Sequence, residues 1–460
     1  FQKNNNLATL SPSKIWFLTK SLEELIDNWL KVGSELIILH GNPINLIPTL
    51  TEIIKAEGVI WNRSIEPTNR NKDHIISEIL KKKNKKVITQ WDQLIVSPNE
   101  IYNSSGLPYK VYGPFWKKWK LEAEVKYSQI SNLNCLCEEN YNQKIFYSLS
   151  EHEKEKIKNI LNKNLILNPK NVFRNIRDAN HFSTSDLCPC LPGELAGRKQ
   201  LKDFLEKEYI YKYKDYRDRL DNNKTSRVSA ALNLGTISPL NAWSLSKAAM
   251  QIAILNSDKE SIIAWQKELC WREFYKHILF HFPHVETGAF KEKWNKFPWN
   301  NNKVWLKAWE KGLTGIPIID AAMRQLIQTG WMHNRARMIV ASFLIKDLMC
   351  SWQLGEKLFM DLLVDGDLAA NNGGWQWSAN CGVDTKQLRI FNPYRQAQRF
   401  DPKGDYIKRW LPELSHISYT DLVNGSILEA ERKFYPKPIV NHDFQQSNFR
   451  RIYKEFIISN

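Results

Sequence analysis

Glu268, Trp271 and Arg272 combine an acid, an aromatic plane and a cation within five residues. Residues three and four apart share one face of a helix, so a helix through this segment would place Glu268 beside the other two. Such a face could bind a planar polar ligand. The same spacing also fits an intrahelical Glu–Arg pair beside a core tryptophan, and the segment alone leaves both interpretations open.

A second polar segment runs from Trp331 to Met338 and reads WMHNRARM. On a helix, Asn334 and Met338 share a face. Two arginines next to an amide and a thioether are unusual for a buried helix. They could pair with carboxylates or phosphates, or they could form the exposed basic start of a helix.

A third segment runs from Asp365 to Trp377 and reads DGDLAANNGGWQW. Its glycines allow a ligand to approach the backbone closely. Two aspartates are too few for a calcium loop, because the later ligands of an EF-hand are missing, and we predict no metal site. Trp375 and Trp377 lie two residues apart, so on a helix they point in different directions.

Three hydroxyl groups fall within five residues, at Thr225, Ser226 and Ser229. Hydroxyls and backbone N–H groups at the start of a helix suit a phosphate. Such residues are more often simple N-caps, so this signal is weak by itself.

The elements that must position these residues follow two patterns. Residues 13–125 alternate short apolar runs with amphipathic stretches, which predicts a parallel α/β sheet. Buried parallel strands are predicted over 35–40, 58–61 and 87–91, with helices over 18–30 and 74–83. From residue 193 the pattern is helical, and helices are predicted over 201–214, 241–255, 261–279, 318–329, 335–350 and 355–363.

These patterns predict an N-terminal α/β domain over residues 1–125 and an all-helical domain over residues 193–460. Between them, residues 126–192 lose periodicity and are rich in lysine and asparagine. We interpret them as an interdomain connection, although a weakly patterned part of a domain would look similar.

Composition narrows the class of protein. The 460 residues are 43% hydrophobic and 25% charged, as in ordinary globular proteins. No apolar run approaches the roughly 20 residues that span a bilayer, so we expect no membrane contact. We also expect a cytoplasmic protein that is a monomer. The net charge of +16 fits either a polyanionic partner or a lysine-rich surface. The seven cysteines include Cys-x-Cys pairs at 135/137 and 188/190, not the Cys-x-x-Cys spacing of zinc sites, so reduced thiols are expected.

Taken together and in this order, the segments resemble the class I cyclobutane pyrimidine dimer photolyases, especially the cyanobacterial type, of the photolyase/cryptochrome family. The resemblance covers nearly the whole chain. It rests on TGIPIIDAAMR (314–324), GWMHNR (330–335) and the DGD-to-WQW run, with WDQL (91–94) and YGPFW (112–116) in the N-terminal half. It implies a Rossmann-like antenna domain, a helical FAD-binding domain, and light-dependent repair of cyclobutane dimers in DNA by a lyase.

The resemblance also implies roles for single residues. FAD would be bound by Tyr213, Thr225, Ser226, Arg227, Val228, Ser229, Trp331, Asn334, Arg337, Asp365, Gly366, Asp367 and Asn371, with Asn371 against the flavin N5. Glu268, Asn334 and Met338 would contact a dimer flipped out of the duplex, between walls formed by Trp271 and Trp377. Trp375, Trp352 and Trp299 would carry electrons to oxidised flavin, and Arg217 and Arg335 would bind the DNA backbone.

Two related functions compete with dimer repair. A cryptochrome would be a blue-light sensor without repair activity. Sensors that resemble this motif carry Asp in the plant type and Cys in the animal type, at the position where this chain has Asn371. Enzymes that repair the (6-4) photoproduct resemble this family but carry a pair of histidines at the positions where this chain has His333 and Asn334.

Two features of the antenna domain stay open. The resemblance places Lys14 and Asp92 at antenna-domain positions where a second chromophore, a deazaflavin or methenyltetrahydrofolate, would bind, but this chain has Asn233 where deazaflavin-type relatives tend to have Lys. The family begins with a strand that carries an Arg-Arg-Asp-Leu-Arg-like run. This sequence has none, so we expect the antenna domain to lack its first strands.

Overall fold

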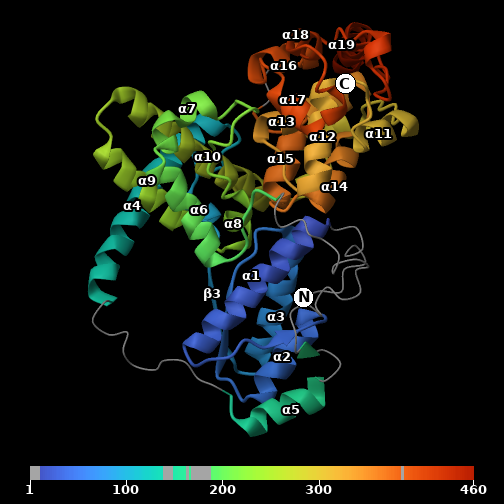
Figure 1. Ribbon diagram of the computed structural model, residues 1–460. Coiled ribbons are helices and arrows are strands. Elements are labelled where there is room, and N and C mark those ends of the chain that lie inside the picture. Colours follow the sequence, from blue (N-terminus) through green and yellow to red (C-terminus); the bar gives the residue numbers. More distant parts are fainter. Residues whose placement is uncertain (1–10, 138–148, 162–164, 167–187, 385–387, 460) are drawn as a thin grey trace.

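The structure, a computed structural model, describes residues 11–137, 149–161, 165–166, 188–384 and 388–459. Figure 1 shows the N-terminal elements at one end of the molecule and the helices that follow residue 188 at the other. None of the described helices has the length and apolarity needed to cross a lipid bilayer.

Three N-terminal helices begin at a proline: α1 (Pro12–Lys31), α2 (Pro43–Ile53) and α3 (Pro67–Lys82). Proline suits the first helical position because its missing N–H would have no helical partner there. Side-chain caps complete two of these starts. Ser11 Oγ accepts from the Lys14 N–H at 3.2 Å, and Asn42 Oδ1 accepts from the Ile44 N–H at 3.1 Å.

A parallel pair of strands, β2 (Gly58–Asn62) and β3 (Lys86–Gln90), lies next to these helices, with Gly58 opposite Lys86. The predicted parallel strands over 58–61 and 87–91 are therefore confirmed in direction. They are wrong in burial, because Ile60 and Ile88 remain 70% and 44% exposed.

The predicted buried parallel strand over 35–40 is also wrong. Only β1 (Ile38–Leu39) forms there, and it pairs antiparallel with β4 (Leu165–Ile166). An apolar run indicates a strand but carries no information about the direction of its partner. The partner here lies more than 120 residues further along the chain.

The segment predicted as a connection contains helices. The boundary placed at residue 125 falls inside α4 (Tyr112–Cys137), and α5 (Glu151–Leu161) packs against α2. Because β4 pairs with β1, the described parts of 149–166 lie against the N-terminal elements. The domain limits themselves stay a prediction.

From residue 188 the described chain is helical, as predicted. The elements are α6 (Glu194–Glu206), η6 (Tyr209–Lys212), α7 (Tyr213–Tyr216), α8 (Ser229–Leu234), α9 (Pro239–Ile252), α10 (Asn256–His281), η7 (Pro283–Glu286), η8 (Glu292–Lys296), α11 (Lys303–Glu310), α12 (Pro317–Thr329), α13 (Asn334–Ser342), η9 (Phe343–Asp347), α14 (Trp352–Leu362), α15 (Leu368–Ser378), α16 (Pro393–Phe400), α17 (Asp405–Trp410), η10 (Pro412–Leu414), α18 (Tyr419–Asn424), η11 (Glu429–Glu431) and α19 (His442–Ser459).

The single helix predicted over 335–350 is wrong in its second half. After α13 the chain passes into a π-helical turn, η9, and then leaves helical geometry at Met349, whose φ is +54°. A side-chain pattern reports an apolar face, and it does not distinguish an α-helical turn from a π-helical one.

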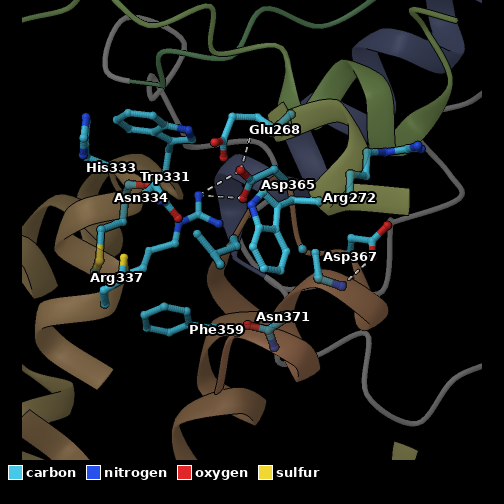
Figure 2. A pocket seen from close by; sticks show the side chains of 18 of the residues that line it. Glu268, Arg272, Trp331, His333, Asn334, Arg337, Phe359, Asp365, Asp367 and Asn371 are labelled. Atoms are coloured by element: carbon cyan, nitrogen blue, oxygen red, sulfur yellow. Dashed lines mark hydrogen bonds and ion pairs between the residues drawn. The ribbon is translucent and has the colours of Figure 1, made fainter. Parts of the chain in front are cut away.

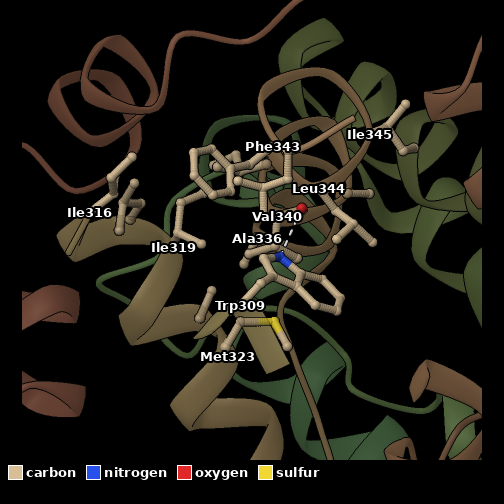
Figure 3. Close-up of a cluster of buried hydrophobic side chains, with 14 of the residues drawn as sticks. Trp309, Ile316, Ile319, Met323, Ala336, Val340, Phe343, Leu344 and Ile345 are labelled. Carbon is tan, nitrogen blue, oxygen red and sulfur yellow. Dashed lines mark hydrogen bonds between the residues drawn. The ribbon is translucent and has the colours of Figure 1, made fainter. Parts of the chain in front are cut away.

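Two hydrophobic cores support the helical part. One surrounds α10 and includes Trp119, Trp243 and Phe274. The other gathers α11 to α19 around Trp309, whose Nε1 donates to the Val340 carbonyl at 3.2 Å (Figure 3). Since α15 packs against α10, α13 and α14, it lies where the two cores meet.

The TGIPIIDAAMR string builds the start of α12. The buried Asp320 carboxylate accepts hydrogen bonds from the Thr314 N–H and hydroxyl, both at 2.7 Å, and from the Gly315 N–H at 2.8 Å. The Tyr435 hydroxyl donates to it at 2.6 Å. Burial nevertheless raises the pKa of Asp320 to about 6. This part of the resemblance therefore reports a folding motif and not a ligand contact.

Candidate functional site

A cavity of about 530 Å³ lies between α7, α8 and α10 on one side and α13, α14 and α15 on the other. All four polar segments of the sequence contribute to its walls. The predicted cofactor and lesion contacts that line it are Tyr213, Thr225, Ser226, Arg227, Val228, Ser229, Glu268, Trp271, Trp331, Asn334, Arg337, Met338, Asp365, Gly366, Asp367, Asn371 and Trp377. Residues more than 160 positions apart in the chain thus share one site, while their individual roles stay predictions.

The Arg337–Asp365 ion pair crosses the middle of this site (Figure 2). Arg337 Nη2 donates to both Asp365 oxygens, at 3.0 and 2.8 Å, and the Ser229 hydroxyl donates to the same carboxylate at 2.6 Å. Arg337 Nε donates to the Met332 carbonyl at 2.9 Å. The Asp365 side chain is only 3% exposed, so the pair fixes the geometry of α8, α13 and the turn before α15.

Asp367 both caps α15 and pairs with a buried lysine. It accepts from the Ala370 N–H at 2.9 Å and lies 2.6 Å from Lys276 Nζ. Burial alone would raise the pKa of Asp367, but the positive charges of Lys276 and Arg272 outweigh it and the pKa is lowered. Sequence reasoning missed Lys276, although its place one turn after Arg272 on the Glu268 face of α10 was a usable signal.

Glu268 pairs with Arg217, at 2.8 Å between Oε1 and Nη1. Arg272 instead donates to the carbonyls of Gln93 at 2.7 Å and Leu232 at 3.0 Å. The alternative of an intrahelical Glu–Arg pair is therefore wrong. Glu268 is 33% exposed on the cavity side. Burial raises its pKa even though Arg217 acts to lower it, so this carboxyl holds its proton at higher pH than a free one.

Asn371 lines the cavity and is held from outside the described lining by Glu356, which also pairs with Asn372. Asn371 Nδ2 donates to the Glu356 carbonyl at 2.9 Å, and Asn372 Nδ2 donates to Glu356 Oε1 at 2.9 Å. Burial raises the pKa of Glu356 to about 7. Figure 2 shows Asn371 and Glu268 on opposite sides of the Arg337–Asp365 pair.

The cavity offers open space along α15 and an unpaired donor at Arg227, which suit a large anionic cofactor. A Cβ built on Gly374 would meet nothing within 4 Å, so the lining face of α15 is open there. Arg227 lines the cavity with its backbone at φ +53°, and its buried Nε has no hydrogen-bond partner among the described residues. Ser226 Oγ accepts from Trp265 Nε1 at 3.2 Å, so it is held in place and not used as an N-cap.

The three predicted electron carriers form two groups. The buried Trp375 lines the cavity, while Trp352 and Trp299 line a second hollow of about 410 Å³. Gly355, one turn after Trp352 on α14, faces Trp375 so closely that a Cβ there would lie 2.1 Å from the indole Cη2. Trp352 is buried and Trp299 is partly buried. This arrangement leads from the cavity wall towards the surface.

The remaining predicted residues lie outside the cavity or at its back. Arg335 pairs with Asp218 at 2.8 Å and lies over the Phe400 ring at 4.5 Å from its centroid. Lys14 Nζ donates to the Met360 carbonyl at 2.8 Å, and Asn233 Nδ2 donates to the Gly366 carbonyl at 3.0 Å. Asp92 accepts from Asn62 Nδ2 at 3.2 Å, near the sheet and apart from these two.

Comparison with known proteins gives the family. Residues 1–132 match the family "DNA photolyase", and residues 265–455 match "FAD binding domain of DNA photolyase". A "Deoxyribodipyrimidine photo-lyase" of Synechococcus is 42% identical over 97% of this chain and 88% of its own length. One from Halobacterium salinarum is 32% identical over 95% of this chain and 86% of its own length.

Solved structures agree with this assignment. A bacterial class III photolyase from Agrobacterium tumefaciens superimposes with a TM-score of 0.80 at 31% identity, over 97% of this chain and 89% of its own. A Synechocystis cryptochrome reaches 0.79 at 24% identity, over 96% and 89%, which shows the shared fold alone. The chain therefore belongs to the photolyase/cryptochrome family and carries its FAD-binding domain.

Proposed function

We propose that this chain is a light-driven DNA repair enzyme of class I that splits cyclobutane pyrimidine dimers. One observation carries the proposal. A single cavity joins a cofactor-type wall, built on the Arg337–Asp365 pair and Asn371, to a wall where Glu268 lies with Trp271 and Trp377. The curated relatives at 42% and 32% identity bear the name of this activity.

FAD, when bound in its reduced form, would supply the light-excited electron that opens the cyclobutane ring and would take it back once the ring has split. The chain's own residues would bind FAD and orient it in the cavity. The Arg337–Asp365 pair would lie alongside the ring system, and the amide of Asn371 would face N5. The segment from Thr225 to Ser229 would hold the phosphates, where Arg227 provides an unpaired donor.

The lesion would enter from the side of Glu268. Glu268, whose pKa burial raises, would contact the flipped dimer, and its ion pair with Arg217 orients the carboxyl. Extruding a base from the duplex costs a few kcal/mol, and stacking on an aromatic side chain returns about 1–3 kcal/mol per base. Two walls, Trp271 and Trp377, could therefore offset the flipping of both pyrimidines.

Damaged DNA is thus the proposed partner of a monomeric protein. Arg217 and Arg335 lie at the site and beside it, and the net charge of +16 would attract the phosphate backbone. A second chromophore, a deazaflavin or methenyltetrahydrofolate, stays a prediction from the resemblance; Lys14 and Asn233 each donate to a main-chain carbonyl, of Met360 and Gly366.

A blue-light sensor without repair activity is the alternative. Asn371 at the cavity wall favours repair, as do the names of the curated relatives. The class I assignment rests on the sequence motifs, since a class III photolyase structure superimposes over 97% of the chain.

The proposal is tested with reduced, flavin-loaded protein and a dimer-containing oligonucleotide under blue light. We expect light-dependent loss of dimers, and no loss in the dark. Glu268→Ala should lower repair by an order of magnitude or more while flavin content stays unchanged. Protein that holds reduced flavin but removes no dimers in the light would refute the repair function.

A further inference from the structure

The YGPFW stretch resembles the family but contributes no residue to the described lining of the cavity. It begins α4, which runs beside α10 (Figure 1). Phe115 packs against Phe274 of α10, with 5.1 Å between ring centroids. One turn further along α4, Trp119 Nε1 donates to the buried Glu273 carboxylate at 2.7 Å. The stretch is therefore fixed against the helix that presents Glu268 and Trp271.

Tyr112, the first residue of this stretch, lies flat against Trp271. The two rings are 3.5 Å apart between centroids and 3° from parallel. The Tyr112 hydroxyl donates to the Lys267 carbonyl at 2.9 Å, one turn before Trp271 on α10. Its backbone N–H donates to the Asp384 carboxylate at 3.3 Å. Burial raises the pKa of the Tyr112 phenol, so the hydroxyl stays protonated and remains a donor.

These contacts cover one of the two faces of the Trp271 indole ring. Tyr112 lies on this face, and Trp271 lines the cavity whereas Tyr112 does not. Because Tyr112 covers one face, a planar group that enters the cavity would stack on the other face. Tyr275 also lines the cavity, and its ring centroid lies 5.6 Å from that of Trp271 at a tilt of 31°. Stacking strength depends on parallel planes, and a side chain already held in the binding orientation loses little freedom when the ligand arrives.

We propose that Tyr112 is a positioning residue for lesion recognition, which fixes the Trp271 plane so that a flipped pyrimidine completes a three-layer stack. This inference rests on the proposed repair function. Tyr112 adds no charge, so it contributes to the preference for damaged DNA and not to the general affinity for the DNA backbone, which charge sets.

The experiment compares the affinity of the flavin-loaded protein for a dimer-containing duplex and for the same undamaged duplex, in the dark and at fixed salt. Tyr112→Leu should weaken binding of the dimer-containing duplex by about two- to tenfold, the range of one aromatic stack, and leave the undamaged duplex unchanged. Tyr112→Phe keeps the ring and should bind within about twofold of the wild type.

Two further variants separate positioning from folding. Tyr109→Leu makes the same substitution three residues earlier, where the ring packs edge-on to Phe115, and should keep the wild-type preference. In a Trp271→Leu background, Tyr112→Leu should cause no further loss, because the layer that it positions is gone. If Tyr112→Leu does not retain flavin, Tyr112→Met is measured in its place and the same ratio decides.

The inference is overturned if the Tyr112 variant keeps the wild-type preference, loses affinity equally for both duplexes, or adds its full effect to Trp271→Leu. A wild-type protein without any preference for the dimer would instead overturn the proposed function, and the inference with it. The two failures are distinguished by the wild-type measurement alone.

Discussion

Replacing Lys276 with methionine removes the positive partner of Asp367 while nearly keeping the volume of the side chain. The two side chains are only 6% and 9% exposed and lie 2.6 Å apart. Leaving one partner of a buried pair unpaired costs about 3–5 kcal/mol. In the variant, Asp367 can take up a proton and so avoid being a buried, unpaired charge. Protonating an aspartate of ordinary pKa at pH 7 costs about 4 kcal/mol, and the loss of stability cannot exceed that cost by much. We therefore expect a loss of about 3–4 kcal/mol in the free energy of unfolding at pH 7.

The pH dependence of this loss follows from the sign of the pKa shift. In the wild type the pKa of Asp367 is lowered, so its contribution is present above pH 4 and is lost as the pH falls further. Without Lys276 the folded-state pKa rises above the unfolded value, and stability then falls as the pH rises. The difference between the two proteins should shrink by about 1.4 kcal/mol per pH unit between pH 7 and pH 5.

Urea unfolding of flavin-free protein, followed by circular dichroism at pH 7 and pH 5, measures this difference. Lys214→Met is the matched control, because the side chains of its pair with Glu260 are 59% and 61% exposed and the urea midpoint should not move. Lys276→Met combined with Asp367→Asn should recover most of the loss. A loss below about 1 kcal/mol at pH 7, or one that stays constant down to pH 5, would refute the assignment of a buried, charge-balanced pair.

Three further predictions concern residues at the cavity and at the second hollow. His333 caps α13 by accepting from the Arg335 N–H at 3.1 Å, and burial lowers its pKa to about 4. The stability of the protein should therefore fall as the pH drops from 6.5 to 4. His333→Asn keeps a cap and should flatten this pH dependence of the thermal unfolding midpoint. Gly373→Ala should destabilise by about 1–3 kcal/mol in urea unfolding, because its Cβ would lie 2.0 Å from the Tyr275 ring, whereas Gly374→Ala meets open space and should not; equal effects would contradict the packing. Trp299→Phe should slow photoreduction of bound flavin, seen as bleaching of its absorption, and spare repair by pre-reduced protein.

The helical part of the fold follows from local signals that the sequence contains. Gly330 ends α12 in left-handed geometry at φ +67°, and Pro317 begins the same helix, as the stop and start signals predict. The N-terminal sheet was predictable in part. Alternating patterns located β2 and β3, but not the exposure of Ile60 or the antiparallel partner of β1, because both depend on distant segments.

The site shows the same division. Residue types and spacing were enough to single out Glu268 and the segment from Asp365 to Trp377, because acids and amides among apolar neighbours are unusual. The role of Asn371 came from the resemblance alone. The sequence by itself could not choose the partner of Glu268, since Arg272 has ideal helical spacing and Arg217 lies 51 residues away. Tertiary structure decided that choice, because Arg272 is committed to two main-chain carbonyls and Arg217 reaches the carboxylate from α7's end. Spacing along one helix fixes which side chains share a face, while only the packing of helices against each other fixes which charges meet across a cavity.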